Sequence, residues 1–247
     1  MIACVGGIGG SDYHATAQGD RPAQSATDYI DCVNEGTITF HSDVANSNST
    51  CGGIVGWPGV EGAGQVCVTK NCINRGDIIL SGLMKGRFGG IQGGAGHIIG
   101  CANYGNISAN NLNVACPLGG VAGYSSYNFK FENNISECSI SAQTAVEAIG
   151  GLIGAYAGQN FNGAADCKVN CVISAAAEGQ VDLGIVVGQV NGANSMTFGQ
   201  VGKPIVVTGG SINGTAITSA NFSGFLHGTP GHKWSDANHK INAVWGE

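Results

Sequence analysis

Hydrophobic and polar residues alternate along a seven-residue pattern, C-x-N-x-G-x-I, that recurs in this chain. Its three copies run from Cys32 to Ile38, from Cys72 to Ile78 and from Cys101 to Ile107. The fixed residues fall on every second position, which is the side-chain alternation of a β-strand, so Cys, Asn, Gly and Ile are predicted to share one face. The positions between them vary and are mostly polar. The pattern therefore predicts a half-buried strand in each copy.

A second pattern, Gly-Gly-aliphatic-x-Gly, keeps step with the first. Clear copies begin at Gly6, Gly52, Gly89, Gly119 and Gly150, and looser ones at Leu183 and Ser223. From Ile38 onward, each copy opens 10 to 14 positions after the isoleucine that closes the preceding copy of the first pattern. This spacing identifies three eroded copies of the first pattern, Asn134-Ser136-Cys138-Ile140, Cys167-Val169-Cys171-Ile173 and Val206-Thr208-Gly210-Ile212.

Patterns that recur every 30 to 40 residues, roughly, are typical of proteins whose repeats stack on one another. The strands are separated by Gly and Asn, and the one helix-like stretch, Ala142 to Ala148, is too short for the helical crossovers of a βαβ fold. We therefore predict an all-β fold, a parallel β-helix of about six to seven coils in a single elongated domain. At roughly 4.8 Å per coil, the rod is expected to be on the order of 30 Å long.

Equivalent residues of neighbouring coils are expected to stack inside such a rod. The predicted aliphatic ladder consists of Ile38, Ile78, Ile107, Ile140, Ile173 and Ile212, and the predicted amide ladder of Asn34, Asn74 and Asn103. Amides in a ladder hydrogen-bond to one another and to turn backbone, which offsets the cost of burying them. The Gly pairs are predicted to take positive φ or to let two backbones approach closely at corners. Apolar Val33, Ile73 and Ala102 at outward positions predict a bend or bulge where each strand begins.

The domain organisation follows from the extent of the repeats. Residues 1–228 are predicted to form the β-solenoid array with loop insertions, and residues 229–247 a C-terminal tail or cap. The longest insertions, residues 10–29, 41–50 and 188–203, are either a binding surface or tolerated loops. The chain starts inside a repeat without a signal-peptide pattern. We expect a fragment of a longer array, rather than removal of an export segment, and an adjacent domain or subunit at the uncapped N-terminal end.

The charge argues against nucleic acid as a partner, and the hydropathy argues against a membrane-spanning segment. The net charge is −6 and only ten Lys and Arg residues are spread along the chain, so no basic patch for nucleic acid is expected. No run of 18 apolar residues occurs, so no membrane-spanning segment is predicted.

Cysteine is the residue type that most invites a chemical role, because the chain has ten. Cys32, Cys72, Cys101 and Cys167 occupy the same slot of the repeat, so we predict that they are small buried rung residues. One or more disulfides remain an alternative, which export would favour. Zinc is disfavoured because Cys67-x4-Cys72 and Cys167-x3-Cys171 lack the tight spacing of zinc sites.

Two further groups of residues are candidate sites. The acids are dispersed and give no paired carboxylates of the kind that glycoside hydrolysis needs; they include Asp12, Asp28, Asp31, Asp43, Asp77 and Asp182. A group near the end contains His227, His232, His239, Trp234 and Trp245. This group is either a metal or sugar site or, as we predict, a terminal segment folded over the last coil. We therefore predict no catalytic, cofactor-binding or metal-binding residues and no cofactor.

The two patterns together resemble the GLUG motif, a Gly-rich repeat of bacterial surface proteins. The closest copy is Gly52 to Gly56 leading to Asn71 to Ile78, and the resemblance covers roughly residues 2 to 228. It implies a right-handed β-solenoid in a large, modular, exported protein, often described as adhesin-like in gut Bacteroidetes and related bacteria. The family supplies no catalytic residues.

The function that this resemblance implies is a non-catalytic extracellular or cell-surface module, either adhesin-like or a structural stalk. Its expected partner is a host or bacterial glycan or protein. A carbohydrate-active β-helix enzyme, a polysaccharide lyase or hydrolase, is one alternative. A phage or fibre structural segment is the other.

Overall fold

The computed structural model describes residues 4–11, 27–45, 48–58, 67–94, 96–112, 116–125, 129–144, 146–158, 160–176, 181–191, 195–228 and 234–246. Most of the predicted insertion 10–29 and parts of the other two lie outside these ranges, as do Asp12 and His232. In the described residues the fold is all-β, and every pairing between named strands is parallel except that of β27 with β28. The one helical element described there is η1 (Phe222–Phe225), and no described helix is long and apolar enough to cross a bilayer.

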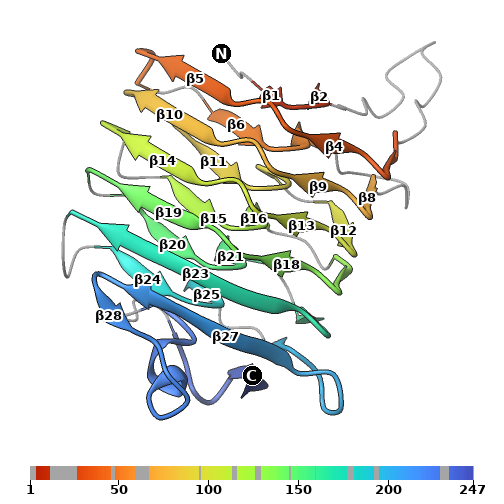
Figure 1. The fold of residues 1–247 in the computed structure, drawn as a ribbon, viewed down its shortest axis with the longest axis vertical. Coiled ribbons are helices and arrows are strands. Elements are labelled where there is room, and N and C mark those ends of the chain that lie inside the picture. The colour runs from red at the N-terminus through yellow and green to blue at the C-terminus, as the bar shows by residue number, and fades with distance from the viewer. Residues whose placement is uncertain are drawn as a thin grey trace.

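The first pattern builds a 12-stranded sheet, called here the long sheet (Figure 1). Its strands along one part are β4 (Val33–Asn34), β9 (Ile73–Asn74), β13 (Ala102–Asn103) and β18 (Ile135–Ser136), and along the other part β5 (Ile38–Ser42), β10 (Ile78–Gly82), β14 (Ile107–Asn110) and β19 (Ser139–Ala142). Two strands span both parts, β23 (Lys168–Ala175) and β27 (Ile205–Ile212). Two short strands pair with β27, β28 (Thr215–Ala216) and β30 (Ala243–Trp245).

The second pattern lies where two further sheets meet. The strands that lead into it form a six-stranded sheet of β1 (Cys4–Gly6), β6 (Asn48–Gly52), β11 (Lys85–Gly89), β15 (Pro117–Gly119), β20 (Ala148–Gly150) and β24 (Asp182–Gly184). The strands that leave it are β2 (Gly9–Ser11) paired with β7 (Val55–Trp57), and β16 (Ala122–Ser125), β21 (Ile153–Tyr156) and β25 (Val187–Val190). Single bridges through Gln92 connect β7 to β16.

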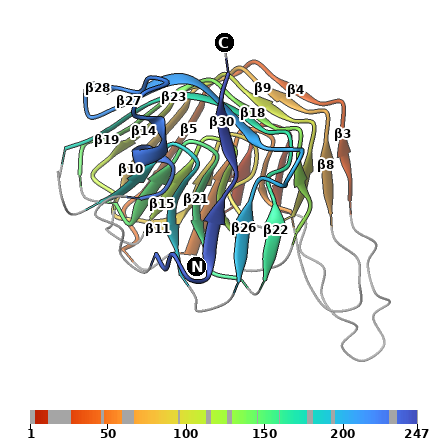
Figure 2. The same ribbon diagram turned by 90° about the horizontal axis from the view of Figure 1, so that it is seen from below.

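Before the chain enters the long sheet, each repeat contributes one strand to one of two small sheets. One contains β3 (Tyr29–Ile30), β8 (Val68–Lys70), β12 (His97–Ile99) and β17 (Phe131–Glu132), and the other β22 (Phe161–Gly163), β26 (Met196–Phe198) and β29 (His239–Ile241). In the view from below, β3 and β8 lie in the same row as β22 and β26 (Figure 2). Equivalent strands of successive repeats are therefore stacked side by side throughout.

The register of the long sheet confirms the predicted isoleucine ladder. Ile78 pairs with Ile38 on one side and Ile107 on the other, and the series continues through Ile140, Ile173 and Ile212. Ile78, Ile140 and Ile173 are fully buried. Because the same side chain recurs at each level, apolar burial fixes the register along the whole stack.

The predicted asparagine ladder is also confirmed. The Asn34 amide nitrogen donates to Asn74 Oδ1 at 2.8 Å, and the Asn74 nitrogen donates to Asn103 Oδ1 at 2.8 Å. Each amide also donates to the carbonyl two residues along, as from Asn74 to Gly76 at 2.9 Å. These bonds satisfy side chains that are buried, fully so for Asn74 and Asn103.

The local asparagine bond bends the chain, so the predicted strand is divided. In the three copies that carry Asn, the strand stops after the asparagine and resumes at the isoleucine, and the copy with Ser136 in that slot is divided in the same place. Side chains that bond to backbone two residues on form such turns. Where Val169 replaces Asn, β23 runs without interruption from Lys168 to Ala175.

The Gly pairs serve close approach and not positive φ, which decides between the two predicted roles. A Cβ on Gly53 would overlap both the Asn74 side chain and the Gly90 carbonyl oxygen. The same relationship recurs between Gly90 and Asn103 and, with a smaller side chain, between Gly120 and Ser136. The two sequence patterns therefore meet across a thin core.

Positive φ occurs instead one residue before the Cys slot. Asp31, Asn71 and Asn133 have φ of 56°, 55° and 56°, and Gly100 has φ of 66°. Asp and Asn tolerate this left-handed conformation better than other residues with a Cβ. These corners account for the bend that was predicted at the start of each strand.

The alignment predicted for the last copy is wrong by one residue at its start. Val169 pairs with Val207, and a bulge follows, so that Cys171 pairs with Gly210 and Ile173 with Ile212. The buried residues Ile205 and Val207 therefore fill the slots that Val206 and Thr208 were predicted to fill. A β-bulge inserts one residue into one strand only, and alternation in sequence cannot locate it.

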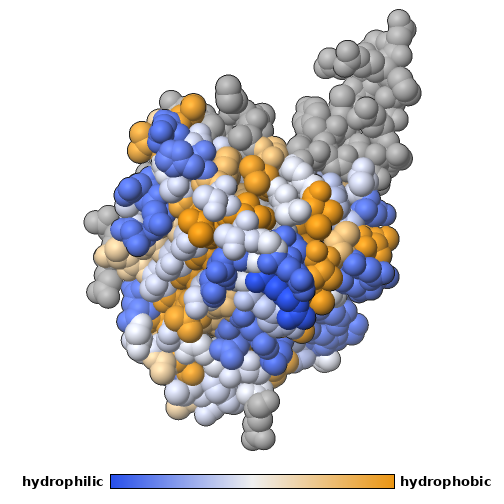
Figure 3. Space-filling model, turned by 45° about the horizontal axis from the view of Figure 1, so that its top comes forward, coloured by the Kyte–Doolittle hydropathy of each residue, from blue (hydrophilic) through white to orange (hydrophobic). Residues whose placement is uncertain are grey.

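The two ends of the stack differ. At the N-terminal end Ile8 is 49% exposed, whereas its equivalent Ile54 is fully buried. Figure 3 looks toward this end and shows hydrophobic residues between hydrophilic ones. At the C-terminal end, β29 and β30 pair with β26 and β27. The predicted division at residue 228 remains a prediction.

Candidate functional site

The outer face of the long sheet carries rows of polar side chains. Both the backbone nitrogen and the amide nitrogen of Asn106 donate to Asp77 Oδ1, at 2.9 and 3.1 Å, and Asn106 Oδ1 accepts from the Ser139 backbone at 2.9 Å. In the neighbouring row the Arg75 guanidinium lies 5.3 Å from the centre of the Tyr104 ring. Each outward position of the pattern thus forms a row on the surface, with one side chain from each repeat.

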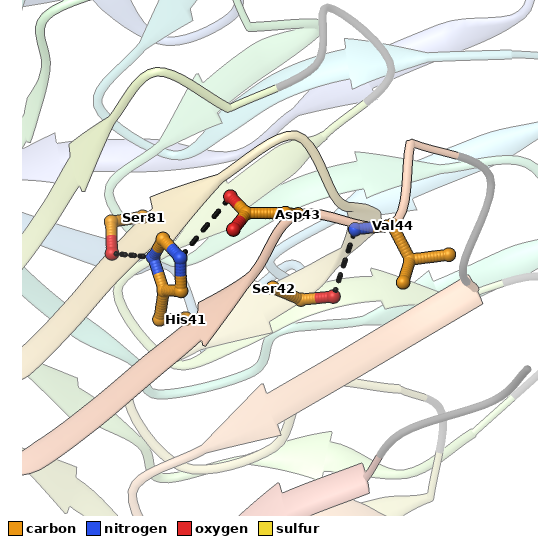
Figure 4. Close-up of polar contacts among 5 residues, drawn as sticks. All are labelled: His41, Ser42, Asp43, Val44 and Ser81. Atoms are coloured by element: carbon orange, nitrogen blue, oxygen red, sulfur yellow. Dashed lines mark hydrogen bonds and ion pairs between the residues drawn. The ribbon is translucent and has the colours of Figure 1, made fainter.

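One cluster on this face combines a serine, a histidine and an aspartate (Figure 4). His41 on β5 and Ser81 on β10 are paired in register. The Ser81 hydroxyl is 2.9 Å from His41 Nδ1, and Asp43 Oδ1 is 3.1 Å from His41 Nε2. The close-up also shows the Val44 nitrogen donating to Ser42 Oγ at 3.4 Å, a bond that shapes the same turn.

The surroundings of this cluster differ from those of an acyl-transfer site. The side chains of His41 and Asp43 are 56% and 78% exposed. Water screens such a pair strongly, whereas catalytic stabilisation of an oxyanion depends on a site that excludes water. The predicted isoleucine ladder would have placed residue 41 beside residue 81, so this cluster was accessible to sequence reasoning although it was missed.

The predicted C-terminal group is brought together in part. The rings of His227 and Trp234 stack at 4.0 Å with an angle of 3°, and Trp234 meets His239 edge to face at 5.1 Å. His239 is buried, and its Nδ1 accepts from the Ser235 nitrogen at 2.9 Å. Trp245 lies apart from them, 5.9 Å from Phe222. Ring packing and backbone bonds thus account for the arrangement.

The predicted dispersal of acids is seen in their contacts. Asp28 accepts from the Val68 nitrogen at 2.9 Å, and buried Asp182 accepts from the Gln189 amide at 3.1 Å. Asp77 bonds to Asn106, and Asp43 to His41. Each of these four carboxylates therefore has its own partner in a different part of the stack.

The cysteines occupy rungs, and eight of the ten are buried. The Cys72 nitrogen donates to the Cys101 sulfur at 3.4 Å, the Cys101 nitrogen to Asn134 Oδ1 at 2.9 Å, and the Asn134 nitrogen to the Cys167 sulfur at 3.4 Å. All ten are free thiols. Among the described residues no three His, Cys, Asp or Glu side chains are grouped to hold a metal.

Burial and contacts between cysteines shift the pKa values of the thiols. It raises the pKa of Cys51, Cys116 and Cys167 to about 12 each. A hydrogen bond with Cys101 lowers the pKa of Cys72 to about 7. Cys138 and Cys171 lie with their sulfurs 3.7 Å apart, and this contact, followed by burial, raises the pKa of Cys138.

A cavity of about 270 Å³ opens beside β12, β17 and β22. It is lined by His97, Phe129, Lys130, Phe131, Glu132, Asn162 and Gly163. Burial, followed by the nearby Lys130 charge, lowers the pKa of His97, whose Nδ1 accepts from the Lys130 nitrogen at 2.8 Å. The neutral imidazole is therefore a structural acceptor on the wall of a small, partly polar hollow.

Polar side chains inside the described stack mainly hold one repeat to the next. The asparagine ladder and the backbone bonds to cysteine sulfur are the clearest cases. Comparison of the chain with protein-family models, with curated proteins and with solved structures finds no match.

Proposed function

We propose that the array forms a right-handed parallel β-helix of about six to seven coils, of the GLUG-motif kind. The proposal is supported by parallel sheets that pass through the repeats in the same order. It is further supported by the pairing of equivalent residues, such as Ile78 with Ile38 and Ile107. The handedness comes from the resemblance and from the general preference for right-handed parallel crossovers.

The function proposed for this array is that of a non-catalytic module of an extracellular or cell-surface bacterial protein. It binds a glycan or protein in an adhesin-like manner. The observation that carries the proposal is the division of the repeat into a constant inner face and a variable outer one. Buried Cys72, Asn74 and Ile78 repeat from level to level, whereas one outer row reads Glu35, Arg75, Tyr104, Glu137 and Asn170. A scaffold that varies its outer row alone supplies a surface for recognition.

The test is binding of the protein to a glycan array together with release of products from a polysaccharide panel. Binding without product release is the expected result. Ester or glycan cleavage by the wild type that is lost in Ser81→Ala would overturn the proposal in favour of the enzyme alternative, because His41, Ser81 and Asp43 are the groups that favour it. Absence of any ligand together with an obligate trimer would favour the fibre alternative.

A further inference from the structure

Arg87 on β11 lies between two aromatic rings that come from other repeats. Its guanidinium carbon is 4.0 Å from the centre of the Tyr124 ring and 5.2 Å from the Trp57 ring. Trp57 ends β7 in the preceding repeat, and Tyr124 belongs to β16 in the following one. Three successive repeats therefore contribute to one site.

A glycine makes room for this arrangement. Gln92 bridges Val55 and Ala122, and the same register two residues further places Gly94 between Trp57 and Tyr124. The Gly94 nitrogen donates to the Gly56 carbonyl at 3.1 Å, which holds Gly94 against β7. A Cβ on Gly94 would overlap the Trp57 ring. The missing side chain is what lets the arginine and the indole share this level.

The guanidinium has aromatic neighbours but lacks a hydrogen-bond acceptor among the described residues. Burial lowers the pKa of Arg87, while Tyr124 and then Glu147 act in the opposite direction. Glu147 exerts this attraction without forming an ion pair with Arg87. Rings flanking a guanidinium leave the edge N–H groups free for an acceptor in its plane. The charge is thus half-buried and only partly compensated.

A second polar group beside Arg87 also lacks a partner. Thr50 pairs with Arg87 in register, so the two side chains point to the same face of the six-stranded sheet. Thr50 is only 4% exposed, and its hydroxyl oxygen is buried without a hydrogen bond. Buried hydroxyls in native proteins are nearly always bonded. An unsatisfied hydroxyl therefore lies on the strand next to Arg87.

We propose that Arg87, held between Trp57 and Tyr124, binds the carboxylate of an acidic glycan, with the Thr50 hydroxyl as a second contact. The planar guanidinium edge matches a planar carboxylate through two parallel bonds. A doubly charged phosphate fits less well than a singly charged carboxylate, because Glu147 and a net charge of −6 oppose the second charge. This inference rests on the proposed function and names the chemical class of its ligand.

The experiment is calorimetric titration of the whole protein at low salt with trigalacturonate and sialyllactose. Each is compared with its neutral counterpart, the methyl ester and lactose. At least one acid is expected to bind about tenfold or more tightly than its counterpart, since bonds to charged groups carry this much. Arg87→Gln should remove that preference, and Arg87→Lys should restore it only in part, because the charge returns without the fork.

Two further variants distinguish the loss of a ligand contact from a loss of folding. Thr50→Val preserves shape and removes one hydroxyl, and it should weaken binding of the acid about threefold or more. Lys240→Gln is the control for the loss of one positive charge, because exposed Lys240 on β29 lies in the last repeat and outside the outer row, so its loss should leave binding unchanged. Circular dichroism checks that each variant remains folded.

The outcomes separate the inference from the proposed function. If neither acid shows binding that depends on Arg87, or if inorganic phosphate binds there instead, the carboxylate site is wrong. Glycan binding that survives in Arg87→Gln would leave the proposed function standing. If the wild-type protein binds no glycan on the array, both the carboxylate site and the proposed glycan binding are wrong.

Discussion

Asn74 fills the space that a side chain on Gly53 would need. Its amide is fully buried and donates to Asn103 Oδ1 and to the Gly76 carbonyl. A Cβ on Gly53 would overlap that amide and the carbonyl oxygen of Gly90. The two repeated patterns of the chain are therefore two sides of one contact, which explains why they keep step along the sequence.

Gly53→Ala should destabilise the protein by about 3 kcal/mol or prevent folding, because one overlapping atom is backbone and cannot rotate away. Urea denaturation followed by circular dichroism measures this. Gly224→Ala is the control, since nothing lies within 4 Å of a Cβ there. It should change the free energy of unfolding by less than about 1 kcal/mol. Equal effects of the two substitutions would contradict the packing described.

Asn74→Asp should destabilise the stack by about 3 kcal/mol at pH 7, because it places an unpaired negative charge in the core and removes two donated bonds. Burial raises the pKa of the introduced carboxyl above the unfolded value of about 3.9. The deficit should therefore be smallest below pH 4 and should grow as the pH rises through the folded pKa.

Denaturation midpoints of wild type and Asn74→Asp between pH 3.5 and pH 8 test this dependence. Asn170→Asp, on the exposed face, is the matched substitution and should stay within about 0.5 kcal/mol of wild type. A deficit for Asn74→Asp that does not depend on pH would argue against a buried carboxyl at this position.

Ile107→Ala should cost about 2 to 5 kcal/mol, the usual range for a buried isoleucine, since Ile107 is 1% exposed. Ile79 lies on the neighbouring strand but faces outward and is 36% exposed. Ile79→Ala should cost less than about 1 kcal/mol. Both are measured by chemical denaturation, and a larger loss for Ile79→Ala would reverse the assignment of inner and outer faces.

Iodoacetamide at pH 8 should label Cys4 and Cys32 in the native protein and leave the eight buried thiols unlabelled. Cys72 is the critical case, because a pKa of about 7 makes it partly thiolate while its side chain is fully buried. Mass spectrometry before and after unfolding should count two and then ten adducts. Fewer than ten adducts after unfolding without reductant would reveal disulfides. Labelling of Cys72 in the native protein would show that local opening of the structure exposes this thiol.

Sequence reasoning was strongest where the same residue recurs. The six isoleucines and three asparagines were predicted to stack, and their pairing confirms it, because each copy must bury the same face. It failed at the last repeat, where a bulge after Val169 shifts the register. The first pattern was also predicted to be one strand, whereas it is divided in the four copies from Cys32 to Ile140.

The all-β class, the repeat and the inward-facing residues of each copy follow from the order of the amino acids, since alternation and recurrence are properties of the chain alone. The folded structure was needed to show how Gly53 meets Asn74 and how Trp57, Arg87 and Tyr124 assemble. These contacts join different repeats or the two faces of the core. The slots of Trp57, Arg87 and Tyr124 change residue from copy to copy, so recurrence in the sequence could not reveal their contact.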